Sequence, residues 1–207
     1  RYRMPSWMIR DQALAVSGLL VETPGGPPVK PYQPAGVWAD VTFGKKTYSQ
    51  DGGDALYRRS LYTFWRRIIR PTMFFDSGSR QTCVVQNTIT NSPLHALGTL
   101  NDVTFVEAAR HLAARVMEES EDTDDGARAD QLFRGVLMRA PSEEERGVIL
   151  EALARLRAEY QNDPDAAEKL LAAGASPPCE GVDTVELAAW TGVSLGVLNL
   201  DETLTKE

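Results

Sequence analysis

A segment rich in proline and glycine near the N-terminus sets the strongest limit on how this chain can fold. Residues 23–36, TPGGPPVKPYQPAG, hold five prolines and three glycines in fourteen positions. Proline lacks an amide hydrogen and fixes φ, so this segment cannot be helical. The wider stretch 23–53 still contains apolar side chains that a folded domain would bury, namely Val29, Tyr32, Val37, Trp38, Val41 and Phe43. We therefore expect an ordered extended arm or lid, with VWADVTF as a short strand or helical turn, and long irregular segments of this kind are often functional.

The composition is that of an ordinary globular protein of one or two domains. Of the 207 residues, 43% are hydrophobic and 25% are charged. No run of about 20 apolar residues is present, so the sequence predicts no membrane span. The first ten residues lack the apolar stretch of a signal peptide and begin with Arg1, which leaves open a mature product or a fragment of a longer chain. Cys83 and Cys179 lie in no metal or redox spacing, so two independent thiols and a disulfide both remain open.

Apolar periodicity and capping residues predict helices over most of the remaining chain. The predicted helices cover about 6–20, 54–67, 93–100, 103–119, 127–139, 143–160, 164–174 and 186–198. Their start signals are Ser6, Ser92 with Pro93, Asp102, Ser142 with Glu145, Asp163 with Pro164, and Asp183 with Glu186. The predicted fold class is mainly α: an irregular multi-helix bundle with a long Pro/Gly-rich arm and at most a short strand pair.

Residues 54–67, DALYRRSLYTFWRR, are predicted to form one amphipathic helix that ends before Pro71. Its apolar face would consist of Tyr57, Leu61, Phe64, Trp65 and Ile68. Arg59, Arg66 and Arg70 would form a second, cationic stripe along the same helix. This segment therefore concentrates four arginines, Arg58, Arg59, Arg66 and Arg67, in a chain with a net charge of −7.

Charge divides the chain into a basic and an acidic part. Residues 1–110 carry 13 Lys+Arg and 8 Asp+Glu, a net charge of +5, whereas residues 111–207 carry 9 and 21, a net charge of −12. The best internal boundary is the acidic linker EESEDTDDG. We expect an N-terminal helical part, 1–120, with the arm and the arginine-rich helix, and an acidic helical part, 121–207. Because opposite charges attract, the two parts are expected to pack as one unit.

Several long segments resemble one family. RRSLYTFWRR, FDSGSR, TNSPLHALGTLND, FVEAAR and LNLDETLTKE are similar to the C-terminal domain of unknown function of planctomycete cytochrome c-type proteins, and the similarity covers nearly the whole chain. The resemblance implies an exported protein, periplasmic or at the cell surface, with several modules. It also implies a preceding half of the same domain, absent from this chain, and neighbouring modules as partners. His95 stands where the family usually has glutamine.

Haem and metal chemistry lack complete motifs. The chain contains no Cys-x-x-Cys-His, so it cannot itself attach a c-type haem, and the resemblance implies haem c on another module. Glu107 and His111 lie four residues apart on one predicted helix face, which fits a metal pair or an ordinary side-chain pair. Asp122, Asp124 and Asp125 lack the glycine and distal glutamate of a calcium loop. We predict no metal site and no cofactor in this chain.

Nucleophilic catalysis would require a serine or cysteine beside a histidine base and an orienting acid. Cys83 with His95 and either Asp76 or Asp102 is the set close in sequence, but no nucleophile motif surrounds the cysteine. Whether the chain is an enzyme stays open.

Arginines are the better candidates for a site, because guanidinium groups bind carboxylate, sulfate and phosphate through paired hydrogen bonds. The candidate anion- and ligand-binding residues are Arg58, Arg59, Arg66, Arg70, Arg80, Asp76, His95, Asn101 and Asp102. In the alternative interpretation these arginines pair internally with Asp11, Asp76, Asp102 or the acidic part. The sequence pI of about 5.0 argues against nucleic acid as a partner.

Two functions follow from these observations. The leading prediction is a non-catalytic structural or interaction domain of an exported, multi-domain cytochrome-type protein. The alternative is the binding or processing of an anionic polysaccharide, sulfated or uronic, through a cleft of arginines and carboxylates.

Overall fold

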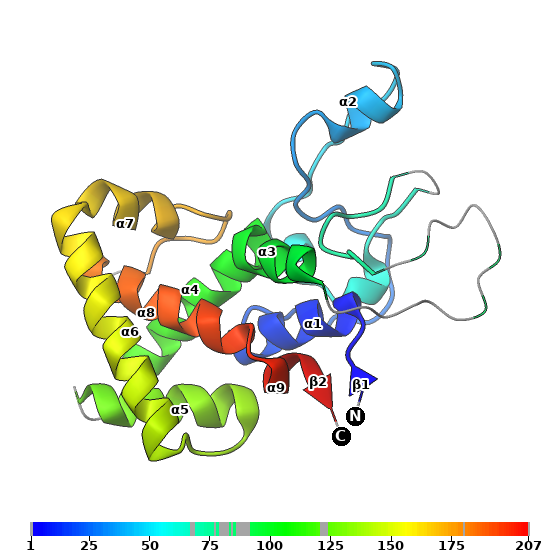
Figure 1. The fold of residues 1–207 in the computed structure, drawn as a ribbon. Coiled ribbons are helices and arrows are strands. Elements are labelled where there is room, and N and C mark those ends of the chain that lie inside the picture. Colours follow the sequence, from blue (N-terminus) through cyan, green and yellow to red (C-terminus); the bar gives the residue numbers. More distant parts are fainter. Residues whose placement is uncertain are drawn as a thin grey trace.

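The computed structural model describes residues 2–66, 69–76, 78, 83, 85, 92–120, 124–179 and 181–206. Over these residues the α-helices are α1 (Ser6–Val16), α2 (Val37–Val41), α3 (Pro93–Asn101), α4 (Val103–Glu119), α5 (Asp125–Leu137), α6 (Glu143–Asn162), α7 (Pro164–Leu171), α8 (Thr184–Leu198) and α9 (Asp201–Leu204). Two short 3-10 helices, η1 (Gly53–Tyr57) and η2 (Ser60–Tyr62), and two strands, β1 (Tyr2–Arg3) and β2 (Thr205–Lys206), complete the elements. The predicted mainly α class with one short strand pair is confirmed (Figure 1).

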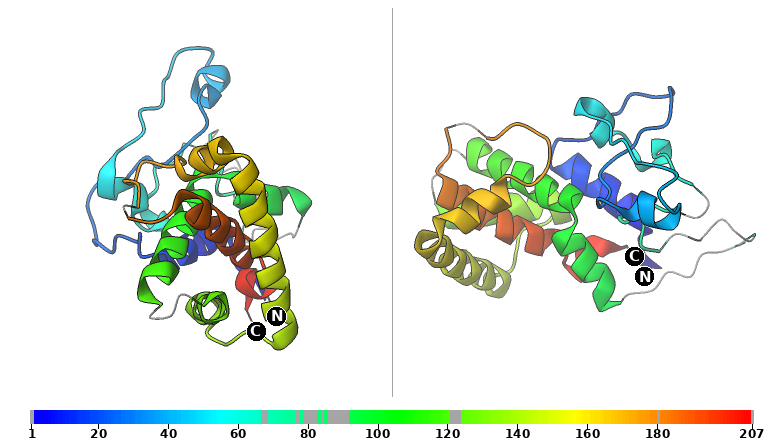
Figure 2. Two further views of the ribbon diagram at one scale, coloured as in Figure 1. Left: turned by 90° about the vertical axis from the view of Figure 1, so that its left-hand side faces the viewer. Right: turned by 90° about the horizontal axis from the view of Figure 1, so that it is seen from above.

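Helix α8 forms the centre of the bundle, packed against α4, α6 and α7 (Figure 2). Trp190 in its middle is fully buried, and buried residues lie on every side of the helix. A helix that is apolar all round belongs in a core rather than on a surface. The same core includes Met4 and Ile9 near the N-terminus and Leu132 and Phe133 in α5. Residues from both predicted parts, 1–120 and 121–207, therefore contribute to one hydrophobic core.

Several predicted helix starts carry the expected side-chain cap. The side chains of Asp102, Ser142, Asp163 and Asp183 each accept a hydrogen bond from a backbone N–H in the first turn of α4, α6, α7 and α8. At α6 the capping box is complete, because the Glu145 carboxylate also accepts from the Ser142 N–H at 2.7 Å.

The start of α1 differs from the prediction. Pro5 is the residue before the helix, and Ser6 is its first residue. The Ser6 N–H donates to Asp76 at 2.9 Å, and the Ser6 hydroxyl donates to the other oxygen of the same carboxylate. The helix ends at Val16, and Gly18 follows it with φ of 78°. A glycine at positive φ ends a helix without strain.

The prediction of one helix over 54–67 is wrong. Up to Arg66 the segment consists of η1, η2 and extended backbone, in which Arg58 bridges to Val21 and Thr63 bridges to Val29 of the arm. Leu61, placed on the predicted apolar face, is 78% exposed.

Contacts from α1 explain this difference. The fully buried Arg10 guanidinium donates to the Leu56 carbonyl at 2.8 Å and to the Arg58 carbonyl at 2.9 Å. The Asp11 carboxylate accepts from the Ser60 N–H at 2.8 Å. Backbone groups that are hydrogen-bonded to side chains of α1 cannot make the i to i+4 hydrogen bonds of a helix. Tertiary contacts therefore override the local helical pattern.

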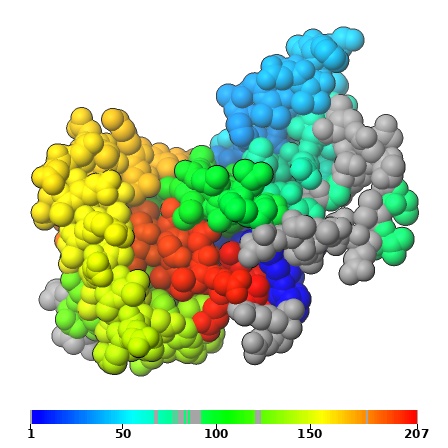
Figure 3. Space-filling view, in the orientation of Figure 1, coloured from blue at the N-terminus to red at the C-terminus, as the bar shows by residue number. Residues whose placement is uncertain are grey.

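The Pro/Gly-rich arm, residues 23–52, is ordered and projects from the bundle with α2 at its far end (Figures 1 and 3). Its first turn is fastened by Arg58, whose guanidinium donates to the carbonyls of Thr23 (3.0 Å), Gly25 and Pro27 (3.1 Å). That guanidinium also lies 4.0 Å from the centre of the Tyr62 ring. Of the two alternatives for VWADVTF, the helical turn is the one formed.

A buried carboxylate fastens the middle of the arm to the bundle. Glu107 in α4 is 1% exposed and accepts hydrogen bonds from the hydroxyls of Tyr32 and Tyr57, each at 2.9 Å. It also accepts from the Ser176 N–H at 2.8 Å and the Ser176 hydroxyl at 2.7 Å. We call this cluster of Glu107, Tyr32, Tyr57 and Ser176 the hub. It joins α4, the arm, η1 and the loop after α7.

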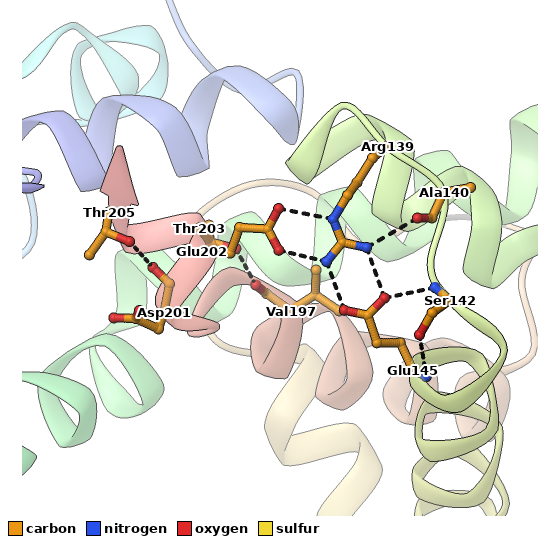
Figure 4. Close-up of polar contacts among 9 residues, drawn as sticks. All are labelled: Arg139, Ala140, Ser142, Glu145, Val197, Asp201, Glu202, Thr203 and Thr205. Carbon is orange, nitrogen blue, oxygen red and sulfur yellow. Dashed lines mark hydrogen bonds and ion pairs between the residues drawn. The ribbon is translucent and has the colours of Figure 1, made fainter. Parts of the chain in front are cut away.

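The two ends of the chain lie side by side. Strand β1 pairs antiparallel with β2, with Arg3 opposite Thr205. Next to this pair, Arg139 is held between Glu145 and Glu202 by hydrogen bonds of 2.6–2.9 Å (Figure 4). This ion-pair network joins the start of α6 to α9 and closes the bundle beside the termini.

Candidate ligand-binding site

The arm and residues 64–66 together form a pocket lined by three cations. Lys30 and Lys46 come from the two sides of the arm, and Arg66 comes from the extended segment after η2. The remaining lining residues are Trp38, Thr47, Tyr48, Ser49 and Phe64. The cavity has a volume of about 250 Å³, and its lining contains no carboxylate. We call it the basic pocket.

Backbone pairing explains why these residues meet. The Val29 N–H donates to the Tyr62 carbonyl at 2.8 Å, and the Phe64 N–H donates to the Val29 carbonyl at 2.6 Å. This pairing sets Lys30 beside Phe64. The Asp51 carboxylate accepts from the Lys30 N–H at 2.8 Å, which holds the returning side of the arm against the outgoing side.

An aromatic cluster forms the floor of the basic pocket. The Trp38 ring lies 5.3 Å from the Tyr48 ring and 6.0 Å from the Phe64 ring, measured between centres. The Arg66 guanidinium lies 5.7 Å from the centre of the Trp38 ring, and the Lys30 ammonium lies 5.8 Å from that of Phe64. Cation–π contacts of this kind hold charged groups in place without neutralising them.

One carboxylate, that of Asp51, lies close to the basic pocket, where it accepts from the Lys30 N–H and lies near Tyr48. Among the described residues, Lys30, Lys46 and Arg66 make no ion pair within 4.0 Å. Arg66 and Lys30 are half-buried, and Lys46 is exposed. Because the whole chain carries a net charge of −7, three cations that line one cavity without an ion pair among the described residues point to an anionic ligand.

A second cavity, the α2–α3 groove, brings together two further predicted residues, Arg70 and His95. Its volume is about 560 Å³, and Val37, Val41 and Leu94 belong to its apolar lining. The His95 ring stacks on Phe75 with a centre-to-centre distance of 4.5 Å. The predicted site residues are thus divided between two cavities, with Arg66 in one and Arg70 and His95 in the other.

The predicted carboxylates and Asn101 have structural partners. Asp76 binds Ser6, and the Asn101 amide donates to the Leu97 carbonyl at 2.8 Å. Asp102 caps α4, accepting from the Thr104 N–H at 2.9 Å. Burial raises the pKa of Asp102 above its ordinary value, and the Thr104 hydrogen bond opposes that rise. None of these three residues lines either of the cavities that contain Arg66, Arg70 and His95.

The remaining predicted arginines lie elsewhere. Arg58 binds the first turn of the arm, as described above, and Arg59 lies 3.9 Å from Asp11, which is a weak ion pair because Arg59 is 59% exposed. Arg80 lies outside the described residues. For Arg59 the alternative of internal pairing with Asp11 is therefore seen, whereas Arg58 is bound by backbone carbonyls.

The pair considered for a metal is also accounted for. Glu107 belongs to the hub, and His111 Nε2 lies 2.7 Å from the Ser176 hydroxyl. Burial lowers the pKa of His111, with the nearby Arg110 adding to the decrease. Within the described part of the chain, no group of three histidine, cysteine or acidic side chains could hold a metal ion.

Sequence reasoning missed Lys30, Lys46 and the aromatic floor as site residues. Lys30 and Lys46 lie in irregular segments without a periodic pattern, and the apolar character of Trp38 predicts only that it is buried. Four aromatic residues and three lysines from position 30 to position 48 were the signal available in the sequence. Basic and aromatic residues interleaved in one segment are typical of anion-binding surfaces.

Comparison with known proteins assigns the chain to a family but not to a function. Among the residues that the structure describes, no helix is long and apolar enough to cross a membrane. No curated protein and no solved structure matches the chain. A family model matches residues 1–153, which include the arm, the basic pocket and the α2–α3 groove. The chain therefore belongs to the PSD1 family of proteins of unknown function (DUF1553).

Proposed function

We propose that this protein is a non-catalytic binding domain that recognises an acidic saccharide, sulfated or uronic, at the basic pocket. The observation that carries the proposal is the convergence of Lys30, Lys46 and Arg66 in one cavity without a carboxylate. Sulfate and carboxylate groups accept charge-assisted hydrogen bonds from such cations. A cavity of about 250 Å³ is large enough for one charged sugar ring rather than for a protein surface.

A saccharide suits the surroundings better than a nucleic acid. Hydroxyl groups of Thr47 and Ser49 line the same pocket and can bind sugar hydroxyls. The phosphate backbone of a nucleic acid would also be repelled by the protein, which has a sequence pI of about 5.0 and an acidic part with a net charge of −12.

Binding rather than processing is supported by the roles of the carboxylates. Cleavage of a polysaccharide commonly uses two carboxylates placed on either side of the bond. Asp76 and Asp102, the two acids that would have served an arginine–carboxylate cleft, are hydrogen-bonded within the fold.

The proposed context is an exported, multi-domain protein, periplasmic or at the cell surface, with haem c on another module. Its support is the resemblance of the sequence segments to planctomycete cytochrome c-type proteins. In this setting the domain would hold a polysaccharide close to the other modules.

A second role, contact with a neighbouring module, is favoured by helix α3. Leu94 and Leu97 on this helix are 75% and 56% exposed, and Leu100 is 38% exposed. Leucines three residues apart form one apolar stripe on a helix. Hydrogen exchange of α3 tests this role: slower exchange in the longer protein than in this chain alone is expected, and equal exchange would count against it.

The binding proposal is tested by calorimetric titration with heparin, polygalacturonate and hyaluronan oligosaccharides, with single-stranded DNA as a comparison. We expect at least one saccharide to bind and its affinity to fall with added salt. Lys46→Gln should weaken binding about tenfold, as expected for loss of one charge-assisted hydrogen bond. The matched control is Lys45→Gln, which removes the same charge from an exposed neighbour that does not line the pocket.

The control separates a site from general electrostatic attraction. Lys45→Gln should change affinity about twofold or less, because a single exposed charge is largely screened. Equal losses for Lys45→Gln and Lys46→Gln would show that the basic pocket is not the site. If DNA binds more tightly than every saccharide, the proposed ligand class is wrong.

A further inference from the structure

A third cavity adjoins the basic pocket and differs from it in charge. It has a volume of about 340 Å³ and shares Trp38, Thr47 and Tyr48 with the basic pocket. The polar side chains that it adds are the amides of Gln33 and Gln50, and its lining contains no lysine, arginine, aspartate or glutamate. We call it the amide pocket.

The amide of Gln33 is held in one orientation. The Trp38 indole N–H donates to Gln33 Oε1 at 2.5 Å, which leaves the two N–H groups of Gln33 as donors. The Tyr48 hydroxyl donates to the Pro31 carbonyl at 2.6 Å, so the tyrosine ring is fixed as a wall between the pockets. Burial raises the pKa of Tyr48, and the nearby Asp51 adds to the increase, so this wall stays uncharged.

The two pockets would therefore accept different sugars. An anion in the basic pocket meets three cations, whereas an anion in the amide pocket would lose water without gaining a counter-charge. Amide groups and the Thr47 hydroxyl suit neutral hydroxyl or N-acetyl groups, which both donate and accept hydrogen bonds.

We propose that the basic pocket and the amide pocket are neighbouring subsites for one acidic heteropolysaccharide, in which a charged sugar is followed by a neutral one. This inference rests on the proposed function and narrows its ligand class. A polymer with a charge on every sugar would place an anion in the amide pocket and bind less well. All lining residues of the amide pocket and most of those of the basic pocket lie between residues 30 and 50 of the arm, and Phe64 and Arg66 complete the basic pocket.

The test compares hexasaccharides of equal length by calorimetric titration of the full chain. Hyaluronan carries a carboxylate on every second sugar, galacturonate and heparin carry a charge on every sugar, and maltohexaose is neutral. We expect hyaluronan to bind about tenfold more tightly than either fully charged hexasaccharide, and maltohexaose to bind most weakly.

Two substitutions connect this preference to the amide pocket. Gln50→Leu removes an exposed amide from the pocket without changing charge, and Gln161→Leu makes the same change on α6, outside both pockets. Gln50→Leu should weaken hyaluronan binding about fivefold and leave galacturonate unchanged within about twofold, as expected for loss of a neutral hydrogen bond. Gln161→Leu should leave both affinities unchanged.

The outcomes separate the two proposals. If a fully charged hexasaccharide binds as tightly as hyaluronan and Gln50→Leu has no effect, the subsite inference is wrong, while the proposed function stands. If no acidic saccharide binds to the chain, both are wrong.

Discussion

The substitution Gly174→Ala tests how much the hub contributes to stability. A Cβ atom at Gly174 would lie 2.2 Å from Oε1 and 2.3 Å from Cδ of the Glu107 side chain. Contacts this short do not occur between nonbonded atoms, so the carboxylate would have to move. It has little room to do so, because Glu107 is 1% exposed and is bound by the hydroxyls of Tyr32 and Tyr57 and by Ser176.

The expected loss has two parts. Gly174 has φ of 95°, and a side chain in that region costs about 1–2 kcal/mol. Displacing the carboxylate would break at least one hydrogen bond to a charged group, at a cost of about 1.5–3 kcal/mol. Gly174→Ala should therefore lower the free energy of unfolding by about 2.5–5 kcal/mol, which is a large share of the roughly 5–15 kcal/mol typical of a domain.

Gly18→Ala is the matched control, because it isolates the backbone cost. Gly18 has φ of 78°, and an added Cβ there would meet no atom within 4 Å. Urea titration followed by circular dichroism measures both variants, and the midpoints are compared at equal m values. If Gly174→Ala costs no more than Gly18→Ala, the hub does not constrain the loop after α7 and the reasoning fails.

Two further predictions concern helix packing and pH. Gly192→Ala should lower the free energy of unfolding by up to about 2.5 kcal/mol, because its Cβ would lie 2.8 Å from a methyl group of Leu156 in α6 and this overpacking, about 1–3 kcal/mol, is offset by a helix gain of about 0.5–1 kcal/mol. Gly196→Ala on the same helix has open space and should raise the free energy of unfolding by that gain alone, so equal effects in urea titration would contradict this account. The Arg139 hydrogen bonds lower the pKa of Glu145 in the folded state to about 2, whereas its pKa in the unfolded state is near 4.5. The Glu145 carboxylate therefore stabilises the folded protein fully at pH values above about 4.5, and this stabilisation is lost as the pH falls toward 2. The urea midpoint of Glu145→Gln should therefore lie below that of the wild type at pH 7 and converge with it near pH 2, and a constant difference across this range would refute the prediction.

The helices of the bundle could be predicted because their limits are set locally. Asp102, Ser142 and Asp183 cap helices through hydrogen bonds to the next few residues, and such signals are visible in the sequence. Val106 and Ala109 of α4 are both buried, and helical periodicity alone places residues three apart on one face of a helix.

The 54–67 segment could not be predicted in this way. Its apolar spacing fits a helix, but its backbone groups bind Arg10 and Asp11, which are more than forty residues away in sequence. A single strong local pattern was outweighed by a buried guanidinium that required carbonyl acceptors.

The candidate site depends on the same kind of distant contact. Lys30, Lys46 and Arg66 are separated by sixteen and twenty residues and meet because the arm folds back on itself. The sequence indicated that cations and aromatic residues were important, and Arg66 was among the residues that it predicted. It did not contain a spacing that would link Arg66 to the lysines, since irregular segments have no fixed period.

The contacts of the arm favour a fixed binding surface over a lid. A lid must open, and opening would break the Tyr32 hydrogen bond to buried Glu107 and the Arg58 hydrogen bonds to Thr23 and Pro27. Each lost bond to a charged group costs about 1.5–3 kcal/mol, so the three together would make the open state rare. A surface that is already ordered gives up little conformational entropy on binding. The arm is therefore suited to hold Lys30 and Lys46 in position for a ligand, which is the property that the basic pocket requires.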